Sequence, residues 1–256
     1  MLAKCNINYE IFGEGERTLL TMHGWGGSID SFKPLIRDMS ALPGIRVLGV
    51  DFPGHGLSPE PDTEWNVDNF KAQILALLDE LGIEKVDITA HSFGGRVALK
   101  LASENPDRVG RMLLTGCAGL LPKRSASDKM RAGVINTLKK GFESKGVQKI
   151  LGEKADKLYD DVQKLLGSAD YKALSPNMRK TFKLVVNQDL ADCLPRIQAP
   201  TFLFWGENDT ATPLWMGQEM EKQIADCALV VKPGATHFAY LERYGEFIAV
   251  AKSFFA

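Results

Sequence analysis

Ser92 lies where a sequence typical of a buried strand meets a sequence typical of a helix, and its hydroxyl is a potential nucleophile. The predicted strand is Val86–Ala90 and the predicted helix is Gly95–Glu104. A strand that turns sharply into a helix strains its central residue, and small residues two positions away, here Ala90 and Gly94, tolerate that turn. An ordinary helix start with serine as N-cap has the same residues, so the motif alone leaves two interpretations open.

A general base for Ser92 would have to be one of four histidines, and His237 is the one that lies far downstream. It follows the last predicted strand, Ala228–Val231, at the sheet edge where open α/β sheets bind ligands. An imidazole there could take the serine proton during attack and return it to the leaving group. We therefore predict His237 as the base, against the alternative of an incidental polar loop residue.

The base needs a carboxylate that fixes its tautomer and stabilises the imidazolium. Trp205–Pro213 supplies two carboxylates after a buried strand, Glu207 and Asp209. We favour Asp209, because Glu207 directly follows the glycine that ends the strand whereas Asp209 lies further into the loop, just before the next helix. Asp209 could also be only a turn or N-cap residue.

Charge that develops on an attacked carbonyl oxygen requires preorganised N–H donors. The glycine-rich turn Met22–Gly27 follows an apolar strand, and we predict the backbone N–H groups of Trp25 and Phe93 as the two donors. The turn could instead be only a tight connection. The remaining histidines, His23, His55 and His91, have no metal-ligand spacing, so we predict scaffolding roles and neither a metal nor another cofactor.

Strand and helix patterns alternate along most of the chain, which indicates an α/β fold with a mostly parallel sheet and helices on both faces. The predicted strands are Cys5–Phe12, Thr18–Met22, Arg46–Val50, Val86–Ala90, Arg111–Thr115, Thr201–Trp205 and Ala228–Val231. The alternation stops between Leu120 and Pro195, where helical spacing dominates over a stretch too long for an ordinary connection. We predict a core domain of residues 1–119 and 196–256 and a helical cap at 120–195.

The predicted cap is basic. Leu121–Lys183 contains fifteen Lys or Arg against seven Asp or Glu, a net charge of +8, and because the whole chain carries −1, the remainder carries −9. A solvated helical face that complements an acidic core domain would explain this charge asymmetry. The functional alternative is that the basic residues attract anionic substrates.

Composition narrows the class of protein. The chain has 256 residues, 45% of them hydrophobic, which is enough for one large domain with an insertion. The four cysteines are scattered, and neither a signal peptide nor a membrane span is recognisable. We expect a soluble cytoplasmic protein that binds a small-molecule acyl substrate and neither nucleic acid nor membrane. The oligomeric state stays open.

The motifs together resemble the α/β-hydrolase fold family over nearly the whole chain. The matching segments are His23–Gly26, Asp51–Ser58, Ala90–Gly95, Gly206–Asp209 and Gly234–His237. The order Ser, Asp, His along the chain is also the order of the family. The resemblance implies an eight-stranded, mostly parallel sheet with a lid over the site, and Ser92, Asp209 and His237 as a catalytic triad.

Within that family the chain is most similar to capped serine carboxylesterases with a His-Gly-Trp-Gly turn. The resemblance implies hydrolysis of esters, or of thioesters, of small or medium acids through an acyl-enzyme. Hydrolases that split carbon–carbon bonds in ring-cleavage products are the first alternative, although they typically have Asn before the nucleophile, where this chain has His91. A ligand-binding receptor that has kept the triad is the second. Acyl and alcohol specificity stay open.

Overall fold

The computed structural model describes residues 1–121 and 174–256. The chain divides into two compact units, one formed by Met1–Leu120 with Lys180–Ala256, the other by Leu121–Arg179. The first unit contains every residue predicted for the site. Residues 122–173 of the predicted cap, which carry most of its excess of basic residues, lie outside the described residues.

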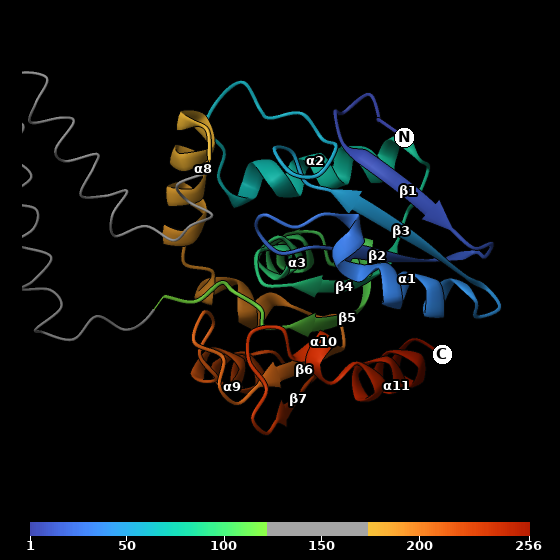
Figure 1. Ribbon diagram of the computed structural model, residues 1–256, viewed down its shortest axis with the longest axis vertical. Helices are drawn as coiled ribbons and strands as arrows, with labels where there is room; N and C mark the ends of the chain where they lie inside the picture. The colour runs from blue at the N-terminus through green and yellow to red at the C-terminus, as the bar shows by residue number, and fades with distance from the viewer. Residues whose placement is uncertain (122–173) are drawn as a thin grey trace, which may run out of the picture. The chain divides into compact units, whose positions relative to one another are not determined.

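A seven-stranded sheet forms the centre of the first unit, with the strand order β1-β3-β2-β4-β5-β6-β7 in the described residues (Figure 1). Its strands are β1 (Asn8–Phe12), β2 (Arg17–Met22), β3 (Ile45–Asp51), β4 (Val86–His91), β5 (Val109–Thr115), β6 (Thr201–Gly206) and β7 (Cys227–Lys232). Only β1 pairs antiparallel with its neighbour, and the other described pairings are parallel. This arrangement confirms the predicted α/β class.

The sheet has one strand fewer, in the described residues, than the eight that the family resemblance implies. At the edge beyond β1, the chain makes a single bridge between Leu2 and Asn8. The turn between them closes through hydrogen bonds of Asn6 N to Ala3 O and Ala3 N to Ile7 O. Asn6 adopts a positive φ of 61°, which bends the chain before a second strand extends along β1.

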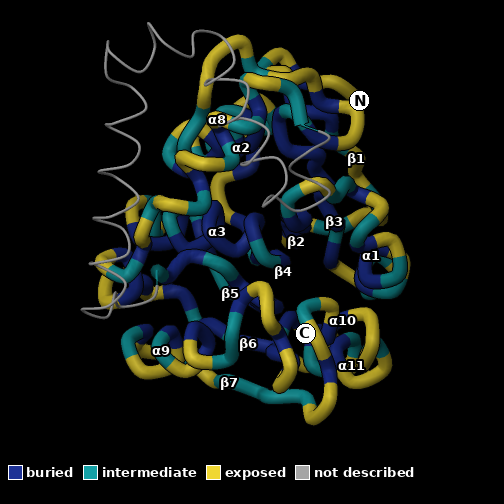
Figure 2. Tube along the Cα trace, turned by 60° about the vertical axis from the view of Figure 1, so that its left-hand side comes forward, coloured by how far each residue is buried: buried dark blue, intermediate teal, exposed yellow. Residues whose placement is uncertain are grey.

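Helices cover both faces of this sheet. The described helices are α1 (Lys33–Ser40), α2 (Val67–Glu80), α3 (Phe93–Glu104), α8 (Pro176–Asn187), α9 (Trp215–Gln223), α10 (Ala239–Glu242) and α11 (Tyr244–Phe255), with short 3-10 turns at η1 (Ile29–Phe32), η2 (Pro106–Arg108) and η3 (Ala191–Arg196). Buried side chains of α2, α3 and α9 form one core, and those of α1, α10 and α11 form a second core on the other face. The central strands are therefore covered on both sides and buried along nearly their whole length (Figure 2).

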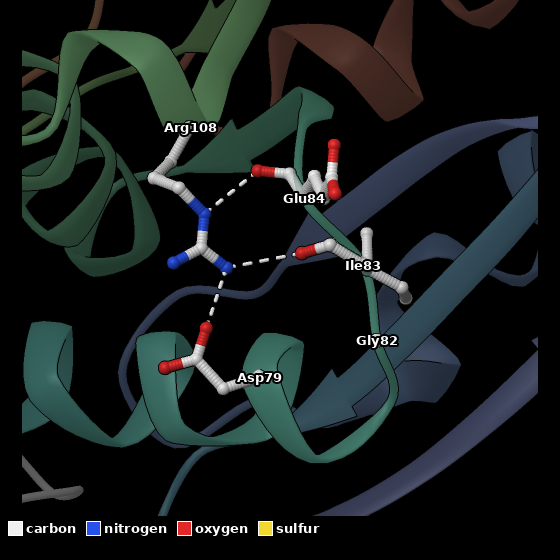
Figure 3. Close-up of a pocket in the computed structure, with 5 residues that line it drawn as sticks. All are labelled: Asp79, Gly82, Ile83, Glu84 and Arg108. Atoms are coloured by element: carbon white, nitrogen blue, oxygen red, sulfur yellow. Dashed lines mark hydrogen bonds and ion pairs between the residues drawn. The ribbon is translucent and has the colours of Figure 1, made fainter.

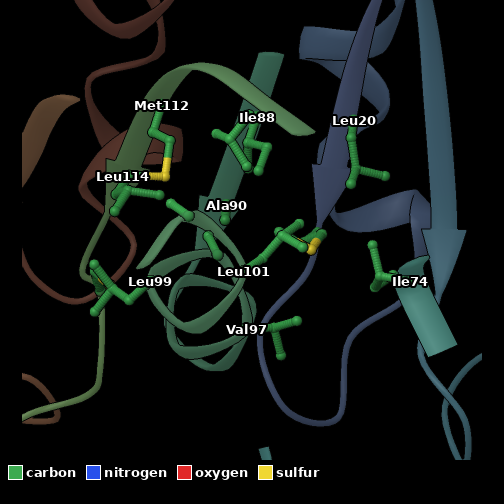
Figure 4. Close-up of a cluster of buried hydrophobic side chains, with 14 of the residues drawn as sticks. Leu20, Ile74, Ile88, Ala90, Val97, Leu99, Leu101, Met112 and Leu114 are labelled. Carbon is green, nitrogen blue, oxygen red and sulfur yellow. The ribbon is translucent and has the colours of Figure 1, made fainter. Parts of the chain in front are cut away.

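Helix α3, which begins directly after Ser92, is held firmly against the sheet. Its residues Val97, Leu99 and Leu101 belong to the same buried cluster as Ile88 and Leu114 of the central strands (Figure 4). All five side chains are fully buried. Because a packed core of this kind resists displacement, the start of α3 is a rigid support for whatever chemistry occurs there.

Residues 180–195, predicted to belong to the cap, group with the first unit instead. The buried guanidinium of Arg96 donates to Gln188 O at 2.8 Å and to Val186 O at 3.3 Å. Trp65 N donates to Thr181 Oγ1 at 3.0 Å. These contacts join sequence-distant segments, so helical periodicity alone does not reveal that the second unit ends earlier than residue 195.

A surface pocket of about 400 Å³ lies at the amino ends of β4 and β5, opposite the edge that carries Ser92. There the Arg108 guanidinium donates to Glu84 O and Ile83 O and forms an ion pair with Asp79 (Figure 3). These bonds tie the end of α2 to the start of β5, which gives Arg108 a structural role.

Candidate active site

Ser92 occupies a strained turn between β4 and α3. Its φ of 51° and ψ of −109° are unusual for a residue with a side chain, and Asn6 is the one other non-glycine residue with a positive φ in the described residues. Ser92 N donates to Thr115 O, and Ser92 O accepts from Gly95 N and Ala118 N. Surrounding bonds of this kind hold a conformation that costs on the order of 1–3 kcal/mol.

The hydroxyl of Ser92 does not cap helix α3. No side-chain capping bond forms from it within the described part of the chain, which differs from the ordinary N-cap considered from the sequence. Ser92 is partly exposed, whereas Phe93 and Gly94 next to it are buried. The strained backbone thus presents the hydroxyl outward at the carboxyl edge of the sheet.

The turn that carries Trp25 packs directly against the start of α3. Gly94 N donates to His23 O at 3.1 Å, and a Cβ on Gly94 would lie only 2.2 Å from Met22 O. Glycine is required at position 94 because two backbones approach closely there. This contact brings the peptides of both predicted oxyanion donors, Trp25 and Phe93, to one edge of the sheet.

His23 fixes the direction of the Trp25 N–H. Its Nδ1 lies 2.7 Å from Gly24 O, and its Nε2 accepts from Phe52 N at 3.0 Å, so the proton is on Nδ1. The Gly24 carbonyl and the Trp25 N–H belong to the same planar peptide, and a bond to one therefore orients the other. Burial lowers the pKa of His23 to about 4, which keeps this arrangement neutral near pH 7.

His237 and Asp209 form a hydrogen-bonded pair. His237 Nδ1 lies 2.8 Å from Asp209 Oδ2, so Nδ1 donates and Nε2 keeps a lone pair for a proton. Asp209 Oδ1 also accepts from the backbone N–H groups of Ala211 and Thr212. Burial of Asp209 opposes ionisation, but the hydrogen bonds from His237 and Thr212 outweigh it and lower the pKa of the carboxyl.

The structure brings Asp209, and not Glu207, to the histidine. Glu207 accepts through Oε2 from Gly234 N and is exposed. Its carboxylate holds the turn before the His237 loop. The choice of Asp209 over Glu207 made from sequence therefore agrees with the positions of both side chains.

Thr212 lies at the candidate site and is not among the residues predicted from the sequence. Its hydroxyl lies 2.8 Å from Asp209 Oδ2, 3.0 Å from Gly116 O and 3.2 Å from His237 Nδ1. This contact links the acid to the end of β5, beside the Ser92 turn. The three-residue spacing from Asp209 to Thr212, typical of side-chain turns, is the signal that could have revealed it.

Aromatic rings pack around the indole of Trp25. Its indole makes edge-on contacts with His55 at 4.7 Å and with Phe93 and Phe182 at 5.1 Å between ring centroids. The indole Nε1 and His55 Nε2 are both buried without a hydrogen-bond partner in the described residues. Apart from these two ring nitrogens, the named neighbours offer aromatic carbon surface to the indole.

Among the described residues, no three His, Cys, Asp or Glu side chains gather where they could hold a metal ion. No helix of the described chain is long and apolar enough to cross a membrane.

Comparison with known proteins identifies the family. The family described as alpha/beta hydrolase fold matches residues 17–244. The chain is 29% identical to the 2-hydroxy-6-oxo-6-phenylhexa-2,4-dienoate hydrolase of Comamonas testosteroni, over 97% of this chain and 90% of that protein.

Solved structures agree with this fold. An enol-lactonase from Burkholderia xenovorans LB400 superposes with a TM-score of 0.71 at 22% identity, covering 97% of this chain and 96% of the other. An esterase from Exiguobacterium antarcticum superposes with a TM-score of 0.71 at 23% identity, covering 97% and 94%. The chain, which shares its fold and nearly its full length with these hydrolases, belongs to the alpha/beta hydrolase fold family.

Proposed function

We propose that this hydrolase cleaves carboxylic esters of small or medium acids through an acyl-enzyme, with Ser92 as nucleophile, His237 as base and Asp209 as acid. One observation carries the proposal, the 2.8 Å bond from His237 Nδ1 to Asp209 Oδ2 at the sheet edge that also bears the strained Ser92. The bond leaves His237 Nε2 free to take a proton, which is what an activated serine requires.

The reaction proceeds in two halves. Ser92 Oγ attacks the ester carbonyl carbon while His237 Nε2 takes its proton, and the N–H groups of Trp25 and Phe93 stabilise the oxyanion. The tetrahedral intermediate collapses, and His237 gives the proton to the departing alcohol. A water then attacks the acyl-enzyme with His237 again as base, which releases the acid and restores Ser92. Throughout, Asp209 stabilises the imidazolium of His237.

Hydrolysis of p-nitrophenyl esters by wild type and Ser92→Ala tests this function. We expect Ser92→Ala to lower kcat by roughly 10⁴-fold or more, since triad residues act as a unit. Unchanged hydrolysis in the variant would refute the assignment. A stoichiometric burst without sustained turnover in wild type would point instead to a receptor that has kept the triad.

Carbon–carbon bond hydrolysis is the second candidate, because the relative from Comamonas testosteroni is named as a dienoate hydrolase and aligns over 97% of this chain. The same serine, base and oxyanion donors would serve a ketone carbonyl, with a carbon leaving group in place of an alcohol. Loss of the yellow colour of a ring-cleavage product, measured beside ester hydrolysis at equal enzyme concentration, discriminates the two. The substrate class with the higher kcat/KM is the assigned one.

Acyl specificity within the ester class is tested by a chain-length series that includes an ester of a dicarboxylic acid. A kcat/KM that rises for the anionic member, and falls again with added salt, would support recognition of the acyl group by the basic residues predicted for the cap. Equal values for neutral and anionic members would rule that out.

A further inference from the structure

His91 is a buried histidine that immediately precedes Ser92 and reaches the loop of the proposed base. Its Nε2 lies 3.0 Å from the backbone oxygen of His237. A carbonyl oxygen only accepts hydrogen bonds, so the proton of the neutral imidazole is on Nε2, and His91 donates. Only 4% of its surface is exposed.

The ring of His91 also packs against the residues that surround the site. Its centroid lies 4.6 Å from that of His237 and 4.9 Å from that of Tyr240. On the other side, a Cβ on Gly24 would come within 2.8 Å of His91 Nδ1. One side chain thus contacts the oxyanion turn and the His237 loop while its own backbone continues into Ser92.

Asp209 and His91 constrain the base in different ways. The Asp209 bond fixes the rotation and tautomer of the His237 ring, from the loop after β6. The His91 bond fixes the backbone of His237 to the end of β4, which is the chain that carries the nucleophile. The second bond therefore joins the loop of the base to the strand end that continues into Ser92.

His91 suits this task because it stays neutral. Burial and the neighbouring His237 ring lower the pKa of His91 to about 3, although the hydrogen bond to the His237 carbonyl and the charge of Asp209 act in the opposite direction. A permanent cation at this position would oppose the positive charge that His237 acquires during catalysis. A neutral donor holds the loop without that repulsion.

We propose that His91 is a positioning residue, whose Nε2–H holds the backbone of His237 at the distance that proton transfer from Ser92 requires. The proposal rests on the proposed function, in which His237 is the base for Ser92. It goes beyond the sequence assignment of His91 as scaffold, because a ring that only filled space would be replaceable by any side chain of similar volume.

Two variants separate positioning from packing. His91→Gln retains an amide N–H donor at about the same reach as Nε2, whereas His91→Leu keeps apolar volume and has no donor. We expect His91→Leu to lower kcat by roughly 10–100-fold with little change in KM, since a displacement of about 1 Å costs up to about 10²-fold. His91→Gln restores most of the loss. Urea unfolding confirms that both variants fold.

The rate at which an alkyl fluorophosphonate labels Ser92, followed by mass spectrometry, supplies a readout that needs no knowledge of the substrate. We expect slow labelling of His91→Leu and near wild-type labelling of His91→Gln. Equal labelling rates in wild type and both variants, or equal decreases in rate in both variants, would overturn the proposed role of His91 and leave the proposed function intact. Absence of labelling in wild type would overturn the proposed function and this role with it. If His91→Leu does not fold, His91→Asn replaces it, because its amide is too short to reach the carbonyl.

Discussion

Substitution of Gly94 by alanine is the perturbation that most directly tests how the site is assembled. A Cβ at this position would lie 2.2 Å from Met22 O and 2.8 Å from His23 O, both backbone atoms. Real Cβ atoms essentially never come within 3.0 Å of another heavy atom, so helix α3 and the oxyanion turn must separate by about 0.8 Å, the difference between the two distances. Neither backbone is free to rotate away as a side chain would be.

The contacts of Gly94 allow us to estimate how much Gly94→Ala lowers both the free energy of unfolding and kcat/KM. Overpacking of a buried site costs about 1–3 kcal/mol, and loss of the bond from Gly94 N to His23 O adds about 1 kcal/mol. A domain of ordinary stability survives that loss. Activity falls further, because the N–H groups of Trp25 and Phe93 move apart, and a displacement of about 1 Å costs on the order of 100-fold in kcat/KM.

Gly245→Ala is the matched control. Gly245 lies in the first turn of α11, is exposed, and has no atom within 4 Å of the position that a Cβ would take. We expect this variant to keep wild-type activity and to gain up to about 0.5 kcal/mol, because alanine favours the helix. Urea unfolding and ester kinetics of both variants, side by side, measure the difference.

Wild-type kcat/KM in Gly94→Ala would refute the reasoning, because it would mean that the two donor peptides do not depend on this contact. A Gly94→Ala variant that loses activity in proportion to an unfolded fraction alone would also refute it. The expected result is a folded protein, by circular dichroism, with impaired catalysis.

Three further predictions concern stability. Thr89→Val should raise the free energy of unfolding by about 1 kcal/mol, because the buried Thr89 hydroxyl has no partner among the described residues. Thr201→Val should lower the free energy of unfolding, because the Thr201 hydroxyl donates to Ala199 O. Urea midpoints that shift in the same direction in both variants would contradict this prediction. Unfolded histidines take up protons near pH 6.5, but His23 and His91 in the folded chain do so only near about 4 and about 3. The contribution of each neutral imidazole to the free energy of unfolding is therefore fully present above about pH 6.5. Below about pH 6.5 it falls by about 1.4 kcal/mol per pH unit, down to the folded pKa of that histidine. Urea unfolding that gives a higher free energy of unfolding at pH 5 than at pH 8 would contradict the assignment. Arg96→Leu should make residues 186–188 susceptible to limited proteolysis, because the carbonyl oxygens of Val186 and Gln188 lose the donor that Arg96 supplies. A digestion pattern identical to that of wild type would mean that other contacts hold this segment.

The α/β class and the positions of Ser92, Asp209 and His237 at strand ends could be predicted from sequence. Each depends on local chemistry, namely β-branched strands, glycines at turns and the residue that follows a strand. Parallel strands bring their carboxyl ends to one edge, so residues 28 positions apart, such as Asp209 and His237, meet without any long-range information.

Other features depend on contacts that no local pattern encodes. The return of the chain to the first unit near residue 180 depends on Arg96, which reaches Gln188 across 92 positions. The described sheet lacks the eighth strand, because the chain turns at Asn6. The sequence does not reveal this turn, because an asparagine at this position is equally compatible with an ordinary loop. Hydrophobic periodicity predicts helices and strands, but it does not predict where one structural unit ends and the next begins.

We predict scaffolding roles for His23 and His91, which flank the glycine-rich turns, and the structure shows which groups they contact. His23 orients the Gly24 peptide and with it the Trp25 N–H, while His91 reaches His237 across 146 positions. Both donate a ring proton to a backbone carbonyl, and burial keeps both neutral. Because a backbone carbonyl on one side of a peptide determines the direction of the N–H on the other side, a buried histidine can set catalytic geometry without touching the substrate. If His91→Gln is active and His91→Leu is not, the hydrogen bond, and not the volume of the ring, is what this position requires.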